Sequence, residues 1–230
     1  FHVQGVVEMW LSELVDFLRT TLRLHLEDSV GQASVWDVEK SREDCLLSFP
    51  VQIGVLTLYI VWTDDVEKSF EDCEAGAEDS ITKCFEVCVS RLNVLIKLIQ
   101  GELSKDERNK IVTFTLADVH NREVVCDLIS SKVENPGDFK WQSRLRSTYN
   151  SEEKSANIRM CDFSTLYSFE YAGNCSRLVI TPLTDRCFVT FAIALRLVLG
   201  GAPIGATGTG KTQTVKEFAG SVGVMCYVFN

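Results

Sequence analysis

The stretch Gly205–Thr212 reads GATGTGKT and is a complete G-x-x-x-x-G-K-[ST] phosphate-binding loop. Glycines let such a loop curl tightly, so that successive backbone N–H groups point at a phosphate and replace its water shell. A helix that starts near Lys211 adds its positive N-terminal end to the same anion. The pattern predicts that Lys211 bridges the β- and γ-phosphates of a nucleoside triphosphate and that the Thr212 hydroxyl ligates Mg²⁺. The predicted phosphate-binding residues are Gly205, Gly208, Thr209, Gly210, Lys211 and Thr212.

The sequence on both sides of this loop favours a nucleotide site. Residues 212–219 (TQTVKEFA) predict a helix, Val224–Phe229 predicts a buried strand after it, and Leu197–Leu199 predicts a short strand before it. The alternative is a glycine-rich turn at a helix start, with no ligand. A chance match to the motif in a chain of 230 residues is on the order of 1%.

The overall composition is that of a globular protein. The chain has 46% hydrophobic and 24% charged residues, which suits one large domain or two small ones. A formal net charge of −9 argues against nucleic-acid binding, which needs a basic face.

The nine cysteines are dispersed and include no C-x-x-C pair. An odd, scattered set favours reduced thiols that pack as small hydrophobic groups. Cys84 and Cys88 are one helical turn apart, but the ligand spacing of a zinc site is absent, so we expect no zinc.

The apolar run Leu46–Trp62 has almost the length of a membrane span. It carries Pro50 and Gln52, has acidic residues close on both sides and lacks a basic flank. The run therefore predicts a buried helix, and we expect no membrane contact.

The first 150 residues predict a mostly helical region. A polar connection is expected over residues 31–44, and a second polar stretch at 150–155 separates this region from one with strand character. There, 158–163 and 166–171 predict a hairpin that turns at Ser164 and Thr165. The predicted helices cover Val6–Leu26, Leu46–Phe70, Asp79–Leu103, residues 111–133, Trp141–Tyr149 and residues 184–199.

Several stretches resemble dynein heavy chains of the axonemal type. FEYAGN (169–174) and RLVITPLTDRC (177–187) are similar to the start of the first AAA+ module, as are the phosphate loop with its flanks and YVFN (227–230). Upstream, VEMWL (7–11), IVWT (60–63), DVHNR (118–122) and DFKWQSRLR (138–146) resemble the C-terminal part of the linker. The resemblance covers essentially the whole chain.

The resemblance implies a fold that is mostly α with a partial α/β segment. Residues 1–150 would be the helical linker portion, 151–168 a connecting hairpin, and 169–230 the first part of a P-loop AAA+ module.

The resemblance also implies a function. The first AAA+ module is the main ATPase of such motors, and the linker is the lever that drives movement toward microtubule minus ends. ATP and Mg²⁺ would be the ligands. The partners would be the rest of the AAA+ ring, dynein intermediate and light chains, and microtubules, in the cytoplasm and the cytoskeleton of the ciliary axoneme. A base-side segment, residues 178–183, would lie against adenine through Leu178, Val179, Ile180, Pro182 and Leu183.

The sequence departs from the family at a few positions. Ala206 and Thr207 replace the usual Pro-Ala, and Gln213 replaces a usual Glu, but no phosphate ligand is lost. The acidic strand motif, the sensor residues and the arginine finger are not found up to Asn230. We therefore expect no catalytic residue in this chain, and binding of ATP with negligible hydrolysis. Lys211-dependent turnover at the rates of the family would contradict that expectation.

Two other functions remain open at this point. The chain could act as a structural or assembly element of a motor complex, with an idle phosphate loop. An unrelated P-loop kinase or GTPase would need a base-specificity motif and a lid after the loop, for which the sequence has no room.

Overall fold

The structure is a computed structural model that describes residues 5–36, 41–173 and 177–229. Predictions that concern residues 37–40 of the polar connection, or Cys175, lie outside the described residues. The helices are α1 (Val7–Ala33), α2 (Arg42–Ser48), α3 (Val51–Glu74), α4 (Ser80–Gln100), α5 (Lys105–Ser130), α6 (Phe139–Gln142), α7 (Pro182–Arg196) and α8 (Lys211–Ser221). The strands are β1 (Arg146–Asn150), β2 (Ser155–Met160) and β3 (Phe163–Leu166).

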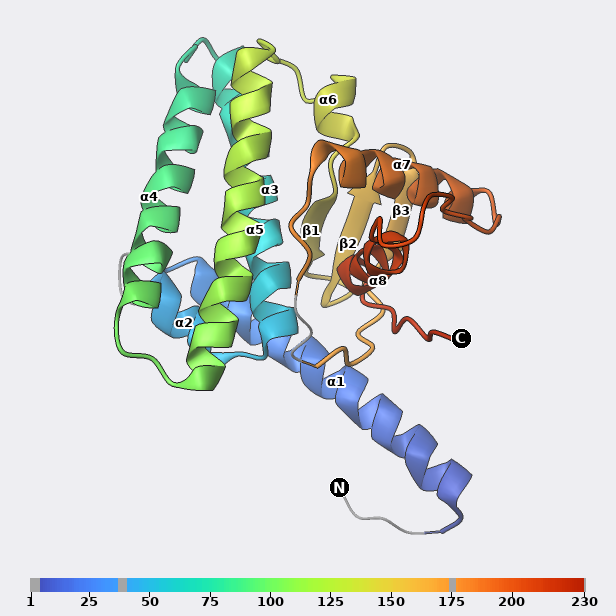
Figure 1. Ribbon diagram of the computed structural model, residues 1–230. Coiled ribbons are helices and arrows are strands. Elements are labelled where there is room, and N and C mark those ends of the chain that lie inside the picture. The colour runs from blue at the N-terminus through green and yellow to red at the C-terminus, as the bar shows by residue number, and fades with distance from the viewer. Residues whose placement is uncertain (1–4, 37–40, 174–176, 230) are drawn as a thin grey trace.

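Helices α2 to α5 form a helical bundle, in which α3, α4 and α5 run side by side (Figure 1). Their apolar stripes meet in a first core that also takes in Trp141 of α6. A buried ion pair joins α2 to α5, with 2.8 Å between Arg42 Nη2 and Asp118 Oδ2. Helix α5 starts at a capping box, in which Ser104 and Glu107 exchange hydrogen bonds.

Helix α3 is buried on nearly all sides. Val55, Tyr59 and Trp62 face the first core, whereas Ile53 and Ile60 face a second core on the other side of the helix. A helix that is apolar all round is buried in a protein or a membrane. No helix in the described part of the chain is both long and apolar enough to cross a membrane. The run Leu46–Trp62 is thus confirmed as buried sequence, divided between α2 and α3 at Pro50.

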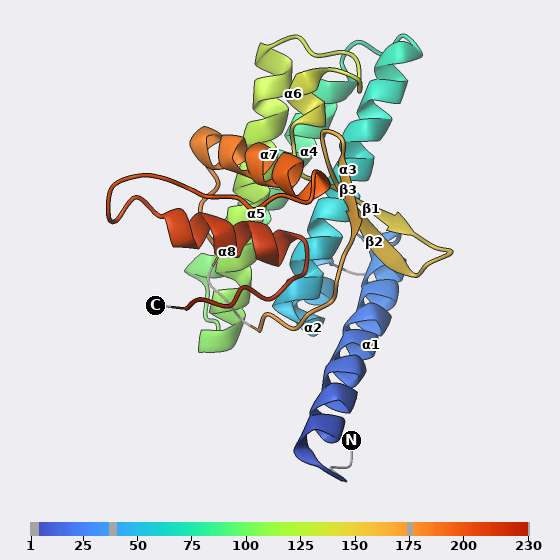
Figure 2. The same cartoon turned by 90° about the vertical axis from the view of Figure 1, so that its right-hand side faces the viewer.

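The second core lies between α1 and α3, the sheet, and the pair α7 and α8. The sheet is antiparallel with the order β1-β2-β3, and Ala156, Ile158 and Met160 of β2 point into this core at every second position. Helices α7 and α8 lie next to each other over the sheet, and both contribute phenylalanines, Phe188 and Phe218, whose ring centroids are 5.3 Å apart (Figure 2). The predicted fold class, mostly α with a partial α/β segment, is confirmed.

Two local predictions were wrong around the sheet. Residues 141–149 are not one helix: α6 ends at Gln142 and Arg146–Asn150 is strand β1, because its pairing with β2 outweighs the helical periodicity. The hairpin turns at Cys161, not at Ser164 and Thr165, which lie within β3. The non-glycine Cys161 takes the left-handed conformation with φ 50°, and Asp162 beside it, without a glycine, is a weaker hairpin signal than Asn-Gly or Asp-Gly.

The two strands predicted beside the phosphate loop were also wrong. Leu197–Leu199 is the hydrogen-bonded C-terminal cap of α7, with Val198 at φ 58° and the Leu199 N–H donating to the Ala194 carbonyl, and Val224–Phe229 is irregular. Strands of a parallel sheet are stable when neighbours pair with them and cover both faces. Within the described residues neither stretch belongs to a sheet, and most of their side chains are exposed.

Trp141 should be a main source of stability for the bundle. It is 0% exposed, and its ring meets those of Trp62 at 5.4 Å and Phe70 at 5.9 Å. We expect Trp141→Ala to lower the free energy of unfolding by about 3–5 kcal/mol, measured by urea denaturation. Phe139→Ala in the same short helix is the control, since Phe139 is 69% exposed and should change stability by less than about 1 kcal/mol. Equal effects of the two substitutions would contradict this packing.

Candidate nucleotide-binding site

The phosphate loop, residues 205–212, is an exposed turn that leads directly into α8. Gly208 and Gly210 have φ of 81° and 82°, a conformation that strains other residues. A Cβ atom at either position would meet no atom within 4 Å, so the space beside the loop is open. Gly210 is the N-cap of α8, and no side chain caps the helix. The first N–H groups of α8 are therefore available to an anion.

The Lys211 ammonium lies over this loop. Its Nζ donates to the carbonyl oxygens of Gly205 at 2.9 Å and Ala206 at 2.6 Å. The Thr209 hydroxyl donates to the same Ala206 oxygen at 2.8 Å. The loop thus holds a cation beside a set of backbone donors at a helix N-terminus, and these residues fit a bound triphosphate. Thr212 is exposed in the first turn of α8, where its hydroxyl can reach a metal ion held by phosphate oxygens.

The base-side segment, residues 178–183, leads into α7 and contacts the loop's helix, α8, through Leu178. Val179 and Leu183 are 57% and 72% exposed, which leaves apolar surface for a flat ring, while Ile180 packs against the second core. Pro182 and Leu183 form the first turn of α7, which is capped by the Thr181 side chain. The Leu178 backbone N–H donates to Glu217 Oε2 on α8 at 2.9 Å.

Glu217 was not identified from the sequence. Its Oε1 forms an ion pair with Arg177 Nε at 2.7 Å, and both side chains are largely buried. Arg177 in turn hydrogen-bonds the hydroxyl of Tyr59 on α3. A buried glutamate in α8 could have been suspected from its place beside Phe218, but nothing in the sequence indicated its partners.

Gln52 of α3 holds the segment that precedes the base-side segment. Its Nε2 donates to the Tyr167 hydroxyl at 2.9 Å and to the Glu170 carbonyl at 2.8 Å, and its Oε1 accepts from the Ala172 N–H at 3.0 Å. Both ends of one amide are therefore used. Gln52 was noted in the sequence only as a polar interruption of an apolar run.

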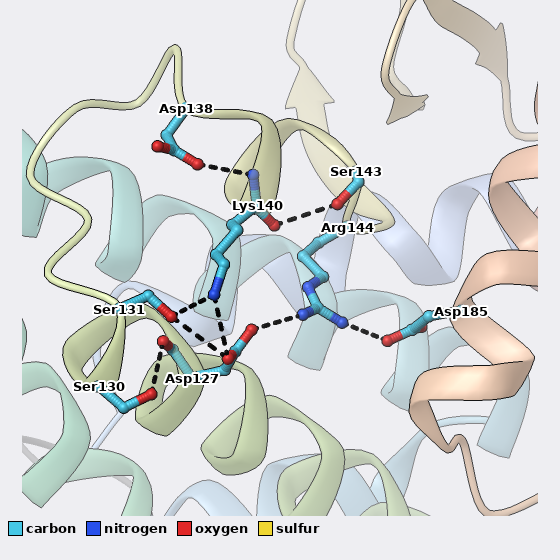
Figure 3. Close-up of polar contacts among 8 residues, drawn as sticks. All are labelled: Asp127, Ser130, Ser131, Asp138, Lys140, Ser143, Arg144 and Asp185. Atoms are coloured by element: carbon cyan, nitrogen blue, oxygen red, sulfur yellow. Dashed lines mark hydrogen bonds and ion pairs between the residues drawn. The ribbon is translucent and has the colours of Figure 1, made fainter.

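A second arginine connects the bundle to α7 (Figure 3). Arg144 Nη2 contacts Asp127 Oδ2 of α5 at 2.8 Å, and Arg144 Nη1 pairs with Asp185 in the first turns of α7. Lys140 also approaches Asp127, with 3.7 Å between Nζ and Oδ1. Because Asp185 lies two residues after the end of the base-side segment, this ion-pair cluster fixes one end of that segment against the bundle.

A cavity of about 350 Å³ lies between α3 and α8. Tyr59, Arg177 and Glu217 line it, together with Gln213 and Lys216. None of the phosphate-loop residues 205–212 does. The loop is thus an open surface feature, and this cavity is a separate space at the boundary between the bundle and α8.

Among the sequence-predicted site residues, the structure brings together the phosphate loop and the start of α8, and it joins Leu178 to the far end of α8. No group of three or more His, Cys, Asp or Glu side chains that could hold a metal ion occurs in the part of the chain that the structure describes.

Comparison with known proteins identifies relatives of nearly the whole chain. A family described as the hydrolytic ATP binding site of the dynein motor region matches residues 167–230. The ciliary dynein beta chain of Tripneustes gratilla is 42% identical over 226 residues, 98% of this chain. Human dynein axonemal heavy chain 17 is 42% identical over 228 residues, 99% of this chain, and the flagellar outer arm dynein beta chain of Chlamydomonas reinhardtii is 39% identical over 226 residues, 98% of this chain. The chain spans 5% of the length of each of these relatives.

The pKa of His120 on α5 should reflect its burial and the positive charges of Arg144 and Arg177, which lie where the bundle meets the α7–α8 region. Burial, followed by repulsion from Arg144 and Arg177, lowers its pKa from 6.5 to about 4, against a weaker opposite effect of Glu123. Between these two pH values the unfolded chain binds a proton that the folded chain does not, so the free energy of unfolding falls as the pH falls through this window. The free energy of unfolding, measured by urea denaturation, should fall less between pH 6.5 and pH 4 in His120→Gln than in the wild-type chain, by roughly 1–2 kcal/mol. An imidazole that titrates near 6.5 in the folded protein, measured by NMR, would contradict this.

Proposed function

We propose that this chain, which belongs to the dynein heavy chain family, binds ATP with Mg²⁺ at residues 205–212 and couples that site to a helical linker. The three parts would be the linker portion (1–150), the connecting hairpin (151–168) and the start of an AAA+ module (169–230). The observation that carries the proposal is the phosphate loop itself, with left-handed Gly208 and Gly210, an uncapped α8 and the Lys211 ammonium over the loop.

Each residue of the loop would make a different contact with the phosphates or with Mg²⁺. Lys211 would exchange its two carbonyl partners for β- and γ-phosphate oxygens, a charge-assisted contact stronger than the contact it leaves. The backbone N–H groups of Gly208, Gly210 and the first turn of α8 would surround the same oxygens. Thr212 would hold Mg²⁺, which supplies neutralising charge when bound.

The base-side segment would recognise the rest of the nucleotide. Exposed apolar side chains of Val179 and Leu183 offer area to the faces of an adenine ring. Leu178, Ile180 and Pro182 would supply backbone and packing support. Because Arg144 holds Asp185 and Glu217 holds Leu178, both ends of this segment are fixed before the ligand arrives.

The proposed role in a motor follows from the relatives. We propose that the chain takes part in ATP-driven movement toward microtubule minus ends, in the cytoskeleton of ciliary axonemes. Its partners would be the remaining AAA+ ring, intermediate and light chains, and microtubules. The contacts of Gln52 with residues 167–172 and of Arg144 with Asp185 of α7 would connect the proposed linker portion to the nucleotide site.

Binding of nucleotide can be tested with Lys211→Ala. We expect a fluorescent ATP analogue with Mg²⁺ to bind the wild-type chain and to bind the variant at least about tenfold more weakly, because the variant lacks the charge on the phosphates. Lys216→Ala is the matched control: it removes the same charge from an exposed position on the same helix.

Equal binding by all three proteins would contradict a site at the phosphate loop. If the wild-type chain does not bind the analogue although it is folded, as shown by a cooperative unfolding transition, the result would favour the alternative function, a structural or assembly element with an idle loop. The observation in favour of that alternative is that the Lys211 ammonium already has two protein partners, the carbonyl oxygens of Gly205 and Ala206.

A further inference from the structure

Helix α8 carries a buried carboxylate, Glu217, on the side that faces the protein interior. The residue is 5% exposed. A glutamate is almost never buried to this extent unless its charge is compensated, since removal from water is costly. Its position therefore needs an explanation in terms of its partners.

The two carboxylate oxygens contact the chain where it enters the base-side segment, at Arg177 and at the segment's first residue, Leu178. Oε2 accepts the Leu178 backbone N–H at 2.9 Å, and Oε1 pairs with Arg177 Nε at 2.7 Å. Because these partners are consecutive residues, one carboxylate fixes both the place and the direction of the chain as it enters the segment. Hydrogen bonds to a charged group are stronger than neutral ones.

The same helix presents the phosphate loop at its other end. Glu217 and the N-cap Gly210 are joined by two turns of α-helix, so their separation along the axis is fixed at about 10 Å. The loop and the base-side segment are far apart in sequence. Through Glu217, a rigid element sets the distance between the place where phosphates would bind and the place where the base would bind.

Arg177 extends this connection to the bundle. It hydrogen-bonds the Tyr59 hydroxyl, and Tyr59 lies in the first core with its ring against Trp62 at a centroid distance of 6.5 Å. The Arg177 side chain is thus held from two sides, by α8 and by α3, and its own movement is restricted.

We propose that Glu217 is a positioning residue of the nucleotide site, which holds the base-side segment at the correct distance from the phosphate loop. This rests on the nucleotide binding proposed above. Glu217 touches no phosphate. Its loss should weaken recognition of the base and leave recognition of the phosphates unchanged.

Two ligands separate these effects: MgATP, which has a base, and magnesium tripolyphosphate, which has only the phosphates. We expect Glu217→Ala to weaken ATP binding by about tenfold and tripolyphosphate binding by less than about twofold, measured by calorimetry on the full chain. Glu217→Gln, which can still accept the Leu178 N–H, should retain more of the ATP affinity than Glu217→Ala. Lys216→Ala is the neighbouring control and should leave the ratio of the two affinities unchanged.

Glu217→Ala leaves Arg177 without its buried partner and can therefore unfold the chain. The double variant Glu217→Gln with Arg177→Met removes both charges and keeps the Leu178 hydrogen bond. It should bind ATP more tightly, relative to tripolyphosphate, than any folded variant that lacks this hydrogen bond, such as Glu217→Met with Arg177→Met.

The outcomes are distinct. If folded Glu217 variants lose both ligands equally, or neither, the positioning role is wrong and the phosphate site remains. If the wild-type chain binds tripolyphosphate with the same affinity as ATP, the base contributes nothing to binding and the positioning role is also wrong. If the wild-type chain binds neither ligand, the proposed function fails and the positioning role fails with it.

Discussion

Helix α3 has to bury two faces at once, and the arrangement of the other elements follows from this requirement. One face closes the core of the bundle with α4 and α5, and the other covers the sheet with α1. A helix with apolar side chains on nearly every side would expose a large apolar surface if either neighbour were absent. The bundle and the α7–α8 region are therefore joined by a shared hydrophobic element as well as by the chain.

Polar contacts then fix the α7–α8 region against that shared element. Gln52 and Tyr59 both lie on α3, and both hold the chain before the base-side segment, Gln52 at Glu170 and Tyr59 at Arg177. Arg144 acts at the other end through Asp185. A buried or half-buried charge pair contributes less to net stability than to the choice of one arrangement, because desolvation offsets much of its attraction. In this protein the arrangement that the pairs select is the one that places the base-side segment beside α8.

The sequence predicted best what depends on local pattern. The glycine turn before α8 could be predicted from spacing alone, because left-handed Gly208 and Gly210 belong to one short segment; phosphate binding by this turn stays a prediction. The long helices could be read from their periodicity, although α1 continues to Ala33, beyond the predicted end at Leu26. The strands could be predicted only in part: a hairpin after residue 155 was expected, but β1 and the Cys161 turn depend on pairing with β2, and the pattern of residues 141–149 is compatible with a helix. Glu217, Arg177 and Arg144 were missed for the same reason, since their meaning lies in partners that are distant in the sequence.

Helix α1 has a mechanical consequence. Its buried residues, Leu22, Leu26 and Ser29, all belong to its C-terminal half, and the other half extends away from the body (Figure 1). This N-terminal half is about 20 Å long, so a rotation of about 10° where the helix meets α3 would displace its first turn by about 4 Å. Arg19 of this helix pairs with Glu170, whose other carboxylate oxygen accepts the Met225 N–H beyond α8. A small displacement of the chain near Met225 would act on α1 through Glu170 and Arg19. Because Arg19 lies close to the place where α1 meets α3, the first turn of α1 would move several times farther than Arg19.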